Sequence, residues 1–309
     1  MKYLYYPGCS LEGTAKEYHE STVSLMAALG AELEEIEDWS CCGASAANNV
    51  SELLSFVLPA RNLALAEKMC QEKQEALDIL VPCSACYLNL KKVAERAKID
   101  FGFVQTINTV LEADGLEFGN HLEIRHLLDV LSRDVEPDWI AKKAMVSFEG
   151  FTAAPYYGCQ CLRPYAEFDD PERPVSMERL ISSTGAAVLD WNMGGVCCSA
   201  SHMSTKPEVG LALVKRILSQ AKSADMILTV CPMCEMNLEA YQKEAGLVSH
   251  ESFSITILYL PQFLGMALGL PQAQTRVDLN LCVTPVFWEK YCGMTSRARN
   301  VRIPAPKAE

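Results

Sequence analysis

Cysteines recur at matching intervals in the two halves of this chain. In each half a single cysteine is followed by an adjacent pair and then by a C-x-x-C motif, and Cys159 opens the second set 150 positions after Cys9 opens the first. Two copies of one pattern predict two similar domains, and 309 residues allow each domain to bury its own core. Ten of the fourteen cysteines belong to the two sets: Cys9, Cys41, Cys42, Cys83 and Cys86, then Cys159, Cys197, Cys198, Cys231 and Cys234.

The segments around the cysteines alternate between two kinds of hydrophobic pattern. This alternation predicts an α/β fold with two pseudo-symmetric, Rossmann-like domains, each with a mostly parallel sheet flanked by helices. We also expect Pro59 to kink or restart its helix. Short apolar runs predict strands over 2–6, 31–36, 77–81, 145–157, 187–191 and 226–230. Longer periodic stretches predict helices over 12–29, 51–76, 86–98, 176–183, 206–222 and 235–245.

Every cysteine of the two sets follows a predicted strand. Ligands of parallel sheets gather beyond the carboxyl ends of the strands, where helix N-termini also favour an anionic, thiolate-bound group. The segments 122–131 and 254–268 each read as a strand running into a helix and are counterparts of one another. We therefore expect an N-terminal domain over 1–140, a C-terminal domain over 141–271, a linker near 137–144, and an extension over 272–309, ending in Pro304-Ala305-Pro306, where the repeat stops.

Composition excludes several classes of partner. A net charge of −12 argues against a nucleic-acid backbone or an anionic membrane surface. No apolar signal region precedes Cys9, so we expect a cytoplasmic protein whose cysteines are reduced and ligate metal. The most apolar segment, 254–270, is slightly short for a membrane span and is interrupted by Pro261, Gly265 and Gly269, so no span is predicted.

The cysteine spacing favours an iron–sulfur group over other cysteine chemistry. A bridge between adjacent cysteines strains the intervening peptide, whereas the pair can ligate neighbouring metal atoms. Five cysteines in a set exceed the four that a structural zinc ion takes, although two zinc sites in an assembly scaffold remain an alternative. The companion cysteines argue against thioredoxin-like redox chemistry at the C-x-x-C motifs. Gly194-Gly195 is interpreted as a flexible loop beside a bulky cofactor and not as a dinucleotide fingerprint.

The other cysteines and one histidine have weaker interpretations. Cys70 is expected to be a small buried residue of a helix. Cys161 lies two residues after a candidate ligand and could have a secondary role, while Cys282 and Cys292 lie outside the repeat. His202 is a candidate proton relay, with a helix-start or surface position as the alternative.

The chain resembles the CCG-domain family, and within it the B subunit of heterodisulfide reductase. The resemblance runs over about 2–270. It rests on the two cysteine sets, on Tyr157-Gly158-Cys159 with Arg163-Pro164, on the run DDPERPVSM at 169–177 and on LPQFLGMALG at 260–269. The family usually has glycine where Ser199 follows the second cysteine pair, so we expect the backbone there to turn differently.

The resemblance implies a function in disulfide reduction. Each set of five cysteines would bind one noncubane [4Fe-4S] cluster, with no flavin or nicotinamide in this chain. A disulfide would bind between the clusters and be reduced by electrons from a ferredoxin-like C subunit, which is supplied by a flavin-containing A subunit. In methanogens the substrate would be the mixed disulfide of coenzymes M and B, and Arg163 and Lys206 are candidates for binding its anionic groups. The alternative enzyme is an electron-relay subunit of a lactate, glycolate or glycerol-3-phosphate oxidising complex.

Overall fold

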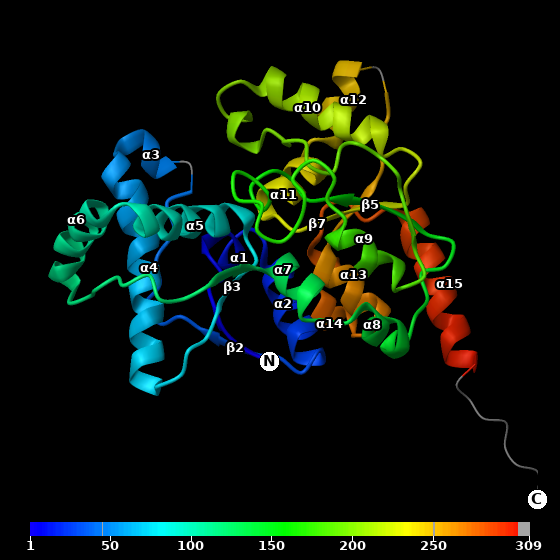
Figure 1. Cartoon of the computed structure of the whole chain (residues 1–309). Coiled ribbons are helices and arrows are strands. Elements are labelled where there is room, and N and C mark those ends of the chain that lie inside the picture. Colours follow the sequence, from blue (N-terminus) through cyan, green and yellow to red (C-terminus); the bar gives the residue numbers. More distant parts are fainter. Residues whose placement is uncertain (45, 250, 302–309) are drawn as a thin grey trace, which may run out of the picture.

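Two parallel four-stranded sheets form the framework of the protein (Figure 1). The computed structural model describes residues 1–44, 46–249 and 251–301. The strand order is β2-β1-β3-β4 in the first sheet and β6-β5-β7-β8 in the second, which confirms the predicted α/β fold with two equivalent halves. The strands are β1 (Lys2–Tyr5), β2 (Glu32–Glu35), β3 (Ile79–Val81), β4 (Ile124–His126), β5 (Thr152–Tyr156), β6 (Ala187–Val188), β7 (Met226–Thr229) and β8 (Thr256–Tyr259).

The strand order places the carboxyl ends of the central strands at the point where a parallel sheet opens a crevice. In the first sheet, β1 pairs with β2 on one side and with β3 on the other, and all three run in the same direction. The chain therefore proceeds from β1 to one edge and then returns across the sheet to β3. This reversal of strand order is the usual position of ligand sites in such folds. The second sheet repeats the arrangement with β5 at its centre.

Two predicted helices of the first half differ from the prediction, and the helices Ala46–Val50, Phe101–Leu111 and Pro137–Lys143 were not predicted. The predicted helix over 12–29 is divided, because the chain turns at Gly13, whose N–H donates to the carbonyls of Cys9 and Ser10. The helix over 52–73 does not restart at Pro59, since Pro59 and Ala60 are buried on one continuous face. The helices are α1 (Cys9–Glu12), α2 (Lys16–Ala28), α3 (Ala46–Val50), α4 (Glu52–Lys73), α5 (Ser84–Ile99), α6 (Phe101–Leu111), η1 (Glu112–Asp114), α7 (Leu127–Arg133) and α8 (Pro137–Lys143).

Helices of the second half follow the same order with one division. The predicted helix over 235–245 breaks at Tyr241. The predicted strand over 145–157 is shorter than expected, because Met145 and Val146 donate to the carbonyl of Ala267 and leave the sheet. The helices are α9 (Ser176–Ser182), η2 (Ala200–His202), α10 (Pro207–Gln220), α11 (Pro232–Ala240), α12 (Gln242–Ser249), α13 (Leu260–Ala267), α14 (Gln272–Thr275), η3 (Val277–Leu279) and α15 (Pro285–Val301).

One hydrophobic cluster extends across both halves, and a second cluster lies wholly within the second half. Helix α2 of the first half packs on α13 and α14 of the second, and α7 of the first half packs on α9 of the second (Figure 1). At the first of these contacts, the rings of Tyr18 and Tyr259 stack with centroids 4.1 Å apart. One continuous hydrophobic cluster contains both Leu4 of β1 and Leu258 of β8. The predicted boundary at 140/141 falls within α8 and remains a prediction.

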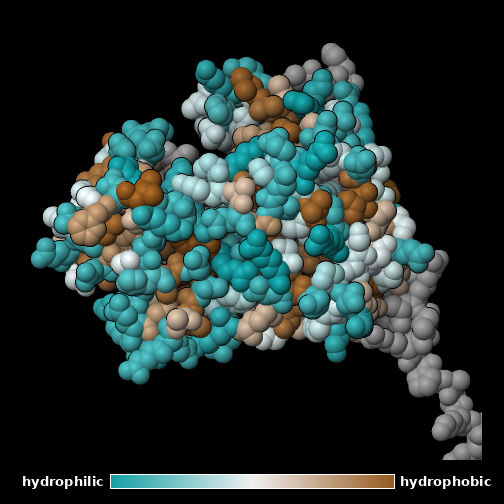
Figure 2. Space-filling model, in the orientation of Figure 1, coloured by the Kyte–Doolittle hydropathy of each residue, from teal (hydrophilic) through white to brown (hydrophobic). Residues whose placement is uncertain are grey.

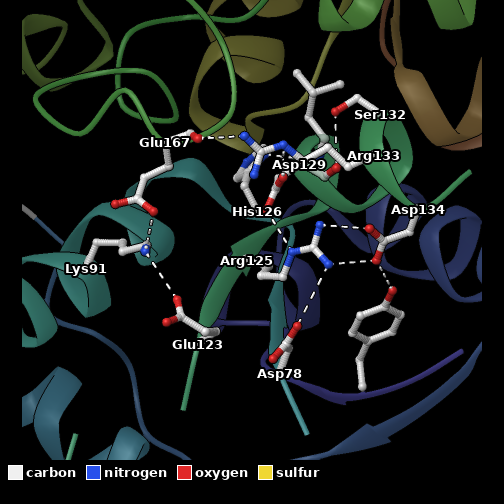
Figure 3. Close-up of polar contacts among 12 residues, drawn as sticks. Asp78, Lys91, Glu123, Arg125, His126, Asp129, Ser132, Arg133, Asp134 and Glu167 are labelled. Carbon is white, nitrogen blue, oxygen red and sulfur yellow. Dashed lines mark hydrogen bonds and ion pairs between the residues drawn. The ribbon is translucent and has the colours of Figure 1, made fainter. Parts of the chain in front are cut away.

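Polar contacts attach a loop of the second half to the first half (Figure 3). Lys91 of α5, with only 3% of its side chain exposed, forms an ion pair of 2.9 Å with Glu167. The guanidinium of Arg133 donates to the Glu167 carbonyl at 2.7 Å. Because Lys91 is almost fully buried, removing Glu167 would leave, among the described residues, only Glu123 to pair with its charge, at 4.0 Å. These contacts fix the loop between Cys159 and α9 against α5 and α7 of the first half.

The segment after α13 is part of the folded structure. Phe287 of α15 is buried and packs edge-on against Phe151, while Lys290 donates to Asp225 at 2.8 Å. Arg276 forms an ion pair with Glu20 of α2 and so joins this segment to the first half. Pro304-Ala305-Pro306 lies outside the described residues. The predicted extension therefore covers the edge of the second half as far as Val301.

Most of the segment 254–270 is buried inside the protein, with Ser254 and Gly269 exposed. All residues of β8 and α13 are buried. Within the part of the chain that the structure describes, no helix combines the length and apolar character needed to cross a bilayer. On the face shown in Figure 2, hydrophobic residues are scattered among hydrophilic ones.

Candidate metal centre

The five cysteines of the first set come together beyond the carboxyl ends of β1, β2 and β3. Cys9 begins α1, Cys41 and Cys42 lie in the loop after β2, and Cys83 is the N-cap of α5. The Sγ atoms of Cys9 and Cys41 are 3.4 Å apart, as are those of Cys42 and Cys86. Cys86 also contacts Cys83, and Cys41 contacts Cys42, so each sulfur touches another of the set.

Glycines make room for this packing. Gly8 has a φ of +76°, and a Cβ at this position would lie 2.7 Å from the sulfur of Cys86. Gly158 is its equivalent, with a φ of +70° and the sulfur of Cys234 only 2.8 Å from a Cβ. Ordinary side chains would have to displace the sulfur and adopt a backbone conformation that L-residues avoid. The glycine before each first cysteine is therefore required by the positions of the sulfurs.

Hydrogen-bond donors around the first set favour negative charge on sulfur. Contacts with the sulfurs of Cys41 and Cys86 lower the pKa of Cys42 to about 3, and the backbone N–H of Ala44 and the amide of Asn89 act in the same direction. The Asn89 Nδ2 atom lies 3.5 Å from the Cys42 sulfur. Thiolates are the form that binds metal. The surroundings of the first set thus favour a thiolate at Cys42, while the same sulfur contacts raise the pKa of Cys41 and Cys86.

The second set repeats this construction at the ends of β5, β6 and β7. Cys159 contacts Cys197, while Cys234 contacts Cys198 and Cys231. Contact with Cys159 lowers the pKa of Cys197 to about 6. Contact with Cys234 lowers the pKa of Cys231 to about 7, assisted by backbone N–H groups at the start of α11. The supporting contacts also correspond between the halves.

Two of those supporting contacts show how closely the halves correspond. Asn237 Nδ2 donates to the Cys198 carbonyl at 2.6 Å, as Asn89 donates to the Cys42 carbonyl at 3.4 Å. The hydroxyl of Tyr156 donates to the carbonyl before Cys197 at 2.6 Å, and that of Tyr6 donates to the carbonyl before Cys41 at 2.7 Å. The same polar scaffold therefore orients both cysteine pairs.

Ser199 does not change the turn after the second cysteine pair, contrary to the expectation from sequence. Its φ of +62° is left-handed, like the φ of +80° at Gly43 in the first set. The N–H of Ser199 donates to the Cys197 sulfur at 3.3 Å, which matches the contact between Gly43 and Cys41. Surrounding contacts hold the serine in a conformation that glycine adopts more readily.

One edge of each set reaches the surface. Cys9, Cys41 and Cys197 are exposed, whereas both C-x-x-C motifs and the second cysteine of each pair are buried. A cavity of about 520 Å³ opens beside Cys9 and Cys41. Its lining includes four carboxylates and no basic side chain: Glu12, Glu35, Glu37 and Asp38.

The two sets are adjacent to one another. The hydroxyl of Tyr18 lies 2.9 Å from the carbonyl of Pro82 and 3.1 Å from that of Val230. These residues immediately precede Cys83 and Cys231. Because one hydroxyl reaches both carbonyls, the C-x-x-C motifs of the two halves begin side by side. Ser84, within the first motif, also reaches the carbonyl of Val230 at 3.1 Å.

Sequence reasoning missed two of three buried residues between the sets, Ser84 and His126, and gave the third, Cys161, a possible secondary role. Ser84 contacts His126, whose ring is fully buried, and Cys161 packs against Ser84 with its thiol donating to the Tyr157 carbonyl at 3.2 Å. Burial raises the pKa of Cys161 to about 12, so it is a thiol. The position of Ser84 inside a C-x-x-C motif was the available signal. No sequence signal pointed to His126, because only the pairing of β3 with β4 brings it to Ser84.

The weaker candidates have other positions. The guanidinium of Arg163 donates hydrogen bonds to the carbonyls of Gly195 and Pro171 at 3.0 and 2.7 Å. These bonds hold the loop before Cys197 in place. Lys206 is exposed at the start of α10. His202 is exposed and lies 3.3 Å from the Ser201 hydroxyl. Cys282 lies outside both sets and contacts the Gln242 amide at 3.1 Å. The basic residues therefore do not converge on one anion site.

The remaining two cysteines also lie apart from the sets. Cys70 is buried in α4, as expected, and Cys292 is exposed in α15. Within the described residues, no three His, Cys, Asp or Glu side chains converge in the arrangement that a single metal ion needs. The cysteine sulfurs instead lie in contacting pairs with thiolate-stabilising N–H groups around them, a donor set that fits an iron–sulfur group.

Known proteins share this sequence pattern. The chain is 32% identical over 284 residues to the 8-methylmenaquinol:fumarate reductase membrane anchor subunit of Wolinella succinogenes, covering 91% of this chain and 96% of that protein. It is 26% identical to a protein of Archaeoglobus profundus that is described as like the B subunit of heterodisulfide reductase, over 92% and 95% of the two chains. It is 25% identical to the B subunit of the ferredoxin/F420H2-dependent CoB-CoM heterodisulfide reductase of Methanosarcina acetivorans, over 88% and 91%.

A solved structure has a similar fold, and a family model matches both halves of the chain. The crystal structure of a hypothetical protein from Helicobacter pylori superposes with a TM-score of 0.71 at 15% identity, covering 92% of this chain. This chain spans about half of that protein, 52% of its length. The model of the cysteine-rich CCG domain matches residues 3–91 and 153–239, one match in each half. This chain therefore belongs to the CCG-domain family and, as its sequence motifs predicted, is related to the B subunits of the heterodisulfide reductases.

Proposed function

We propose that this chain is the catalytic subunit of a heterodisulfide reductase-type complex that reduces a disulfide to two thiols. Cys9, Cys41, Cys42, Cys83 and Cys86 would hold one noncubane [4Fe-4S] cluster. Their counterparts in the second half, Cys159, Cys197, Cys198, Cys231 and Cys234, would hold the other. When bound, such clusters accept and donate single electrons. Electrons would come from a ferredoxin-like subunit supplied by a flavin-containing subunit, all in the cytoplasm.

The contact of Tyr18 with both strand ends is the observation that carries this proposal. Its hydroxyl reaches the carbonyls before Cys83 and Cys231 at 2.9 and 3.1 Å. Opening a disulfide consumes two electrons and two protons, so two adjacent one-electron sites suit the reaction. The remaining residues hold these sites in place: Gly8 and Gly158 leave space for sulfur, and Asn89 and Asn237 orient the cysteine pairs.

The charges near the exposed cysteines restrict the class of disulfide that could bind there. The cavity beside Cys9 and Cys41 is lined by carboxylates, and Arg163 is engaged by backbone carbonyls. An electronegative cavity repels sulfonate and phosphate groups. We therefore propose a disulfide without anionic groups at this end, and expect the mixed disulfide of coenzymes M and B to be a poorer substrate.

The test is anaerobic purification of the native complex followed by metal and activity assays. We expect about eight iron atoms and eight acid-labile sulfides per chain, four for each cluster. Reduced dye should be oxidised by a neutral disulfide. Cys42→Ser should lose iron from the first set, whereas Cys70→Ser, a buried cysteine outside the sets, should keep it. Stoichiometric zinc without sulfide would refute the proposal and support a zinc-bound scaffold.

A second candidate function is electron transfer within a quinol:fumarate reductase. It is favoured by the 32% identity to the Wolinella succinogenes subunit, which exceeds the identities to the heterodisulfide reductase relatives cited above. In that reaction a quinol loses two electrons and two protons, and fumarate gains the same to give succinate. The chain would then relay electrons without binding a disulfide.

The purified complex distinguishes the two candidates. Oxidation of reduced dye by fumarate but by no disulfide, with both sites loaded with iron, would support the electron relay. Turnover with a disulfide, lost in Cys42→Ser and retained in Cys70→Ser, would support the reductase.

A further inference from the structure

A buried hydroxyl connects the two cysteine sets. Ser84 directly follows Cys83 and is 1% exposed. Its Oγ lies 3.1 Å from the carbonyl of Val230 in the second half and contacts the sulfur of Cys231. On its other side, Oγ lies 3.1 Å from Nε2 of His126. A residue of the first motif is therefore within hydrogen-bonding reach of a sulfur of the second set.

The surrounding contacts determine which way this hydroxyl donates. The N–H of Leu128 donates to Nδ1 of His126 at 3.2 Å, so the ring proton lies on Nε2, which faces Ser84, and the ring also contacts the backbone of Pro82 and Val230. Burial lowers the pKa of His126 to about 3, which keeps the ring neutral. A neutral ring with its proton on Nε2 can donate to Ser84 but cannot accept from it, so Ser84 keeps its own proton to donate.

Two groups compete to accept the Ser84 proton: the Val230 carbonyl and the Cys231 sulfur. The Val230 carbonyl already accepts from the hydroxyl of Tyr18 at 3.1 Å. Ser84 can therefore turn to the Cys231 sulfur without leaving this carbonyl unpaired. A thiolate is the stronger acceptor, because hydrogen bonds to charged groups are roughly twice as strong as neutral ones.

We propose that Ser84, oriented by His126, is a positioning residue that donates a hydrogen bond to the Cys231 thiolate and raises the reduction potential of the group held by the second set. An added electron increases the negative charge on the sulfur ligands, so a donor to sulfur stabilises the reduced form. The inference rests on the proposed function only in that the second set holds an iron–sulfur group.

The corresponding position in the second half makes this effect one-sided. Pro232 follows Cys231 as Ser84 follows Cys83, and proline has neither a hydroxyl nor a backbone N–H to donate. The first set therefore receives no reciprocal hydrogen bond from this position. This contribution favours electrons on the second set, whereas Asn89 supplies a donor to the Cys42 sulfur of the first set.

The experiment is a redox titration of the anaerobic native complex monitored by electron paramagnetic resonance. In Ser84→Ala, the one-electron equilibrium of the second site should shift about tenfold toward the oxidised form, which is about 59 mV. Ser84→Thr keeps the hydroxyl and should restore the wild-type value. Ser132→Ala removes a part-buried hydroxyl from α7 and should change neither site. Cys42→Ser identifies the signal of the first set.

A histidine variant tests the orientation step. His126→Phe keeps a ring to pack on Phe168 and Tyr87 but removes the donor to Ser84, so it should lower the same potential by less. His121→Gln, at an exposed histidine, should have no effect. Unchanged potentials in Ser84→Ala and His126→Phe at full iron and sulfide content would overturn this inference and leave the proposed function standing. Lack of iron and sulfide in the wild-type protein would overturn the proposed function itself.

Discussion

Alanine at position 8 should force a sulfur of the first set out of place. Gly8 has a φ of +76°, and a Cβ would meet the Cys86 sulfur at 2.7 Å. Cys86 has only 3% of its surface exposed, and its side chain is too short to move far. The substitution therefore tests whether the position of the sulfur depends on the absence of a side chain at residue 8.

The loss of unfolding free energy expected for Gly8→Ala has two parts. A non-glycine residue at positive φ costs roughly 1–2 kcal/mol. Forcing an extra methyl group into a packed site costs roughly 1–3 kcal/mol more. We therefore expect Gly8→Ala to lower the free energy of unfolding by roughly 2–5 kcal/mol. The variant should also lose iron from the first set, because the added Cβ displaces the sulfur of Cys86, a proposed ligand.

Gly30→Ala is the matched control. Gly30 has a φ of +74°, but a Cβ there meets nothing within 4 Å, so only the backbone part of the cost applies. Urea denaturation under anaerobic conditions measures both variants, and iron and sulfide analysis follows the metal. Equal destabilisation by the two substitutions, with iron retained in Gly8→Ala, would refute the steric argument.

Three further substitutions test separate parts of the structure by urea denaturation. Burial raises the pKa of Glu17 from 4.5 to about 7, so stability should fall as pH rises through this interval. Glu17→Gln should remove roughly 1–2 kcal/mol of that decline, and an unchanged pH profile would contradict this. Ser199→Gly should stabilise the protein by roughly 1 kcal/mol because of the left-handed φ, whereas a loss of stability would show that the hydroxyl matters more. Tyr18→Phe should cost roughly 1–3 kcal/mol, since two buried carbonyls lose a donor; no change would mean that Ser84 already satisfies Val230.

The order of helices and strands could be predicted because a short stretch of sequence specifies each of them. The apolar run before Cys83 and the periodic stretch after it specify a strand and a helix through the alternation of side chains. Both C-x-x-C motifs accordingly lie where they were expected, at strand ends. Errors arose where a local hydrogen bond competed with the periodicity, as at Gly13 and at Tyr241.

Packing between the halves could not be predicted in this way. The stack of Tyr18 on Tyr259 joins residues 241 positions apart, and no periodicity relates them. The second half buries a cluster of its own, but the larger cluster spans both halves because α2 and α7 pack on helices of the opposite half. Chain connectivity does not specify which half a helix covers when both halves offer equivalent faces.

The sequence by itself determined which thiols gather, because a cysteine placed after a parallel strand is carried to the same edge as its neighbours. Only the tertiary structure decided what lies between the two sets. The pairing of β3 with β4 brings His126 to Ser84, and Cys161 reaches Ser84 only once the two halves are packed together. Hydrogen bonds act over about 3 Å, and only the packed chain brings these groups within that range.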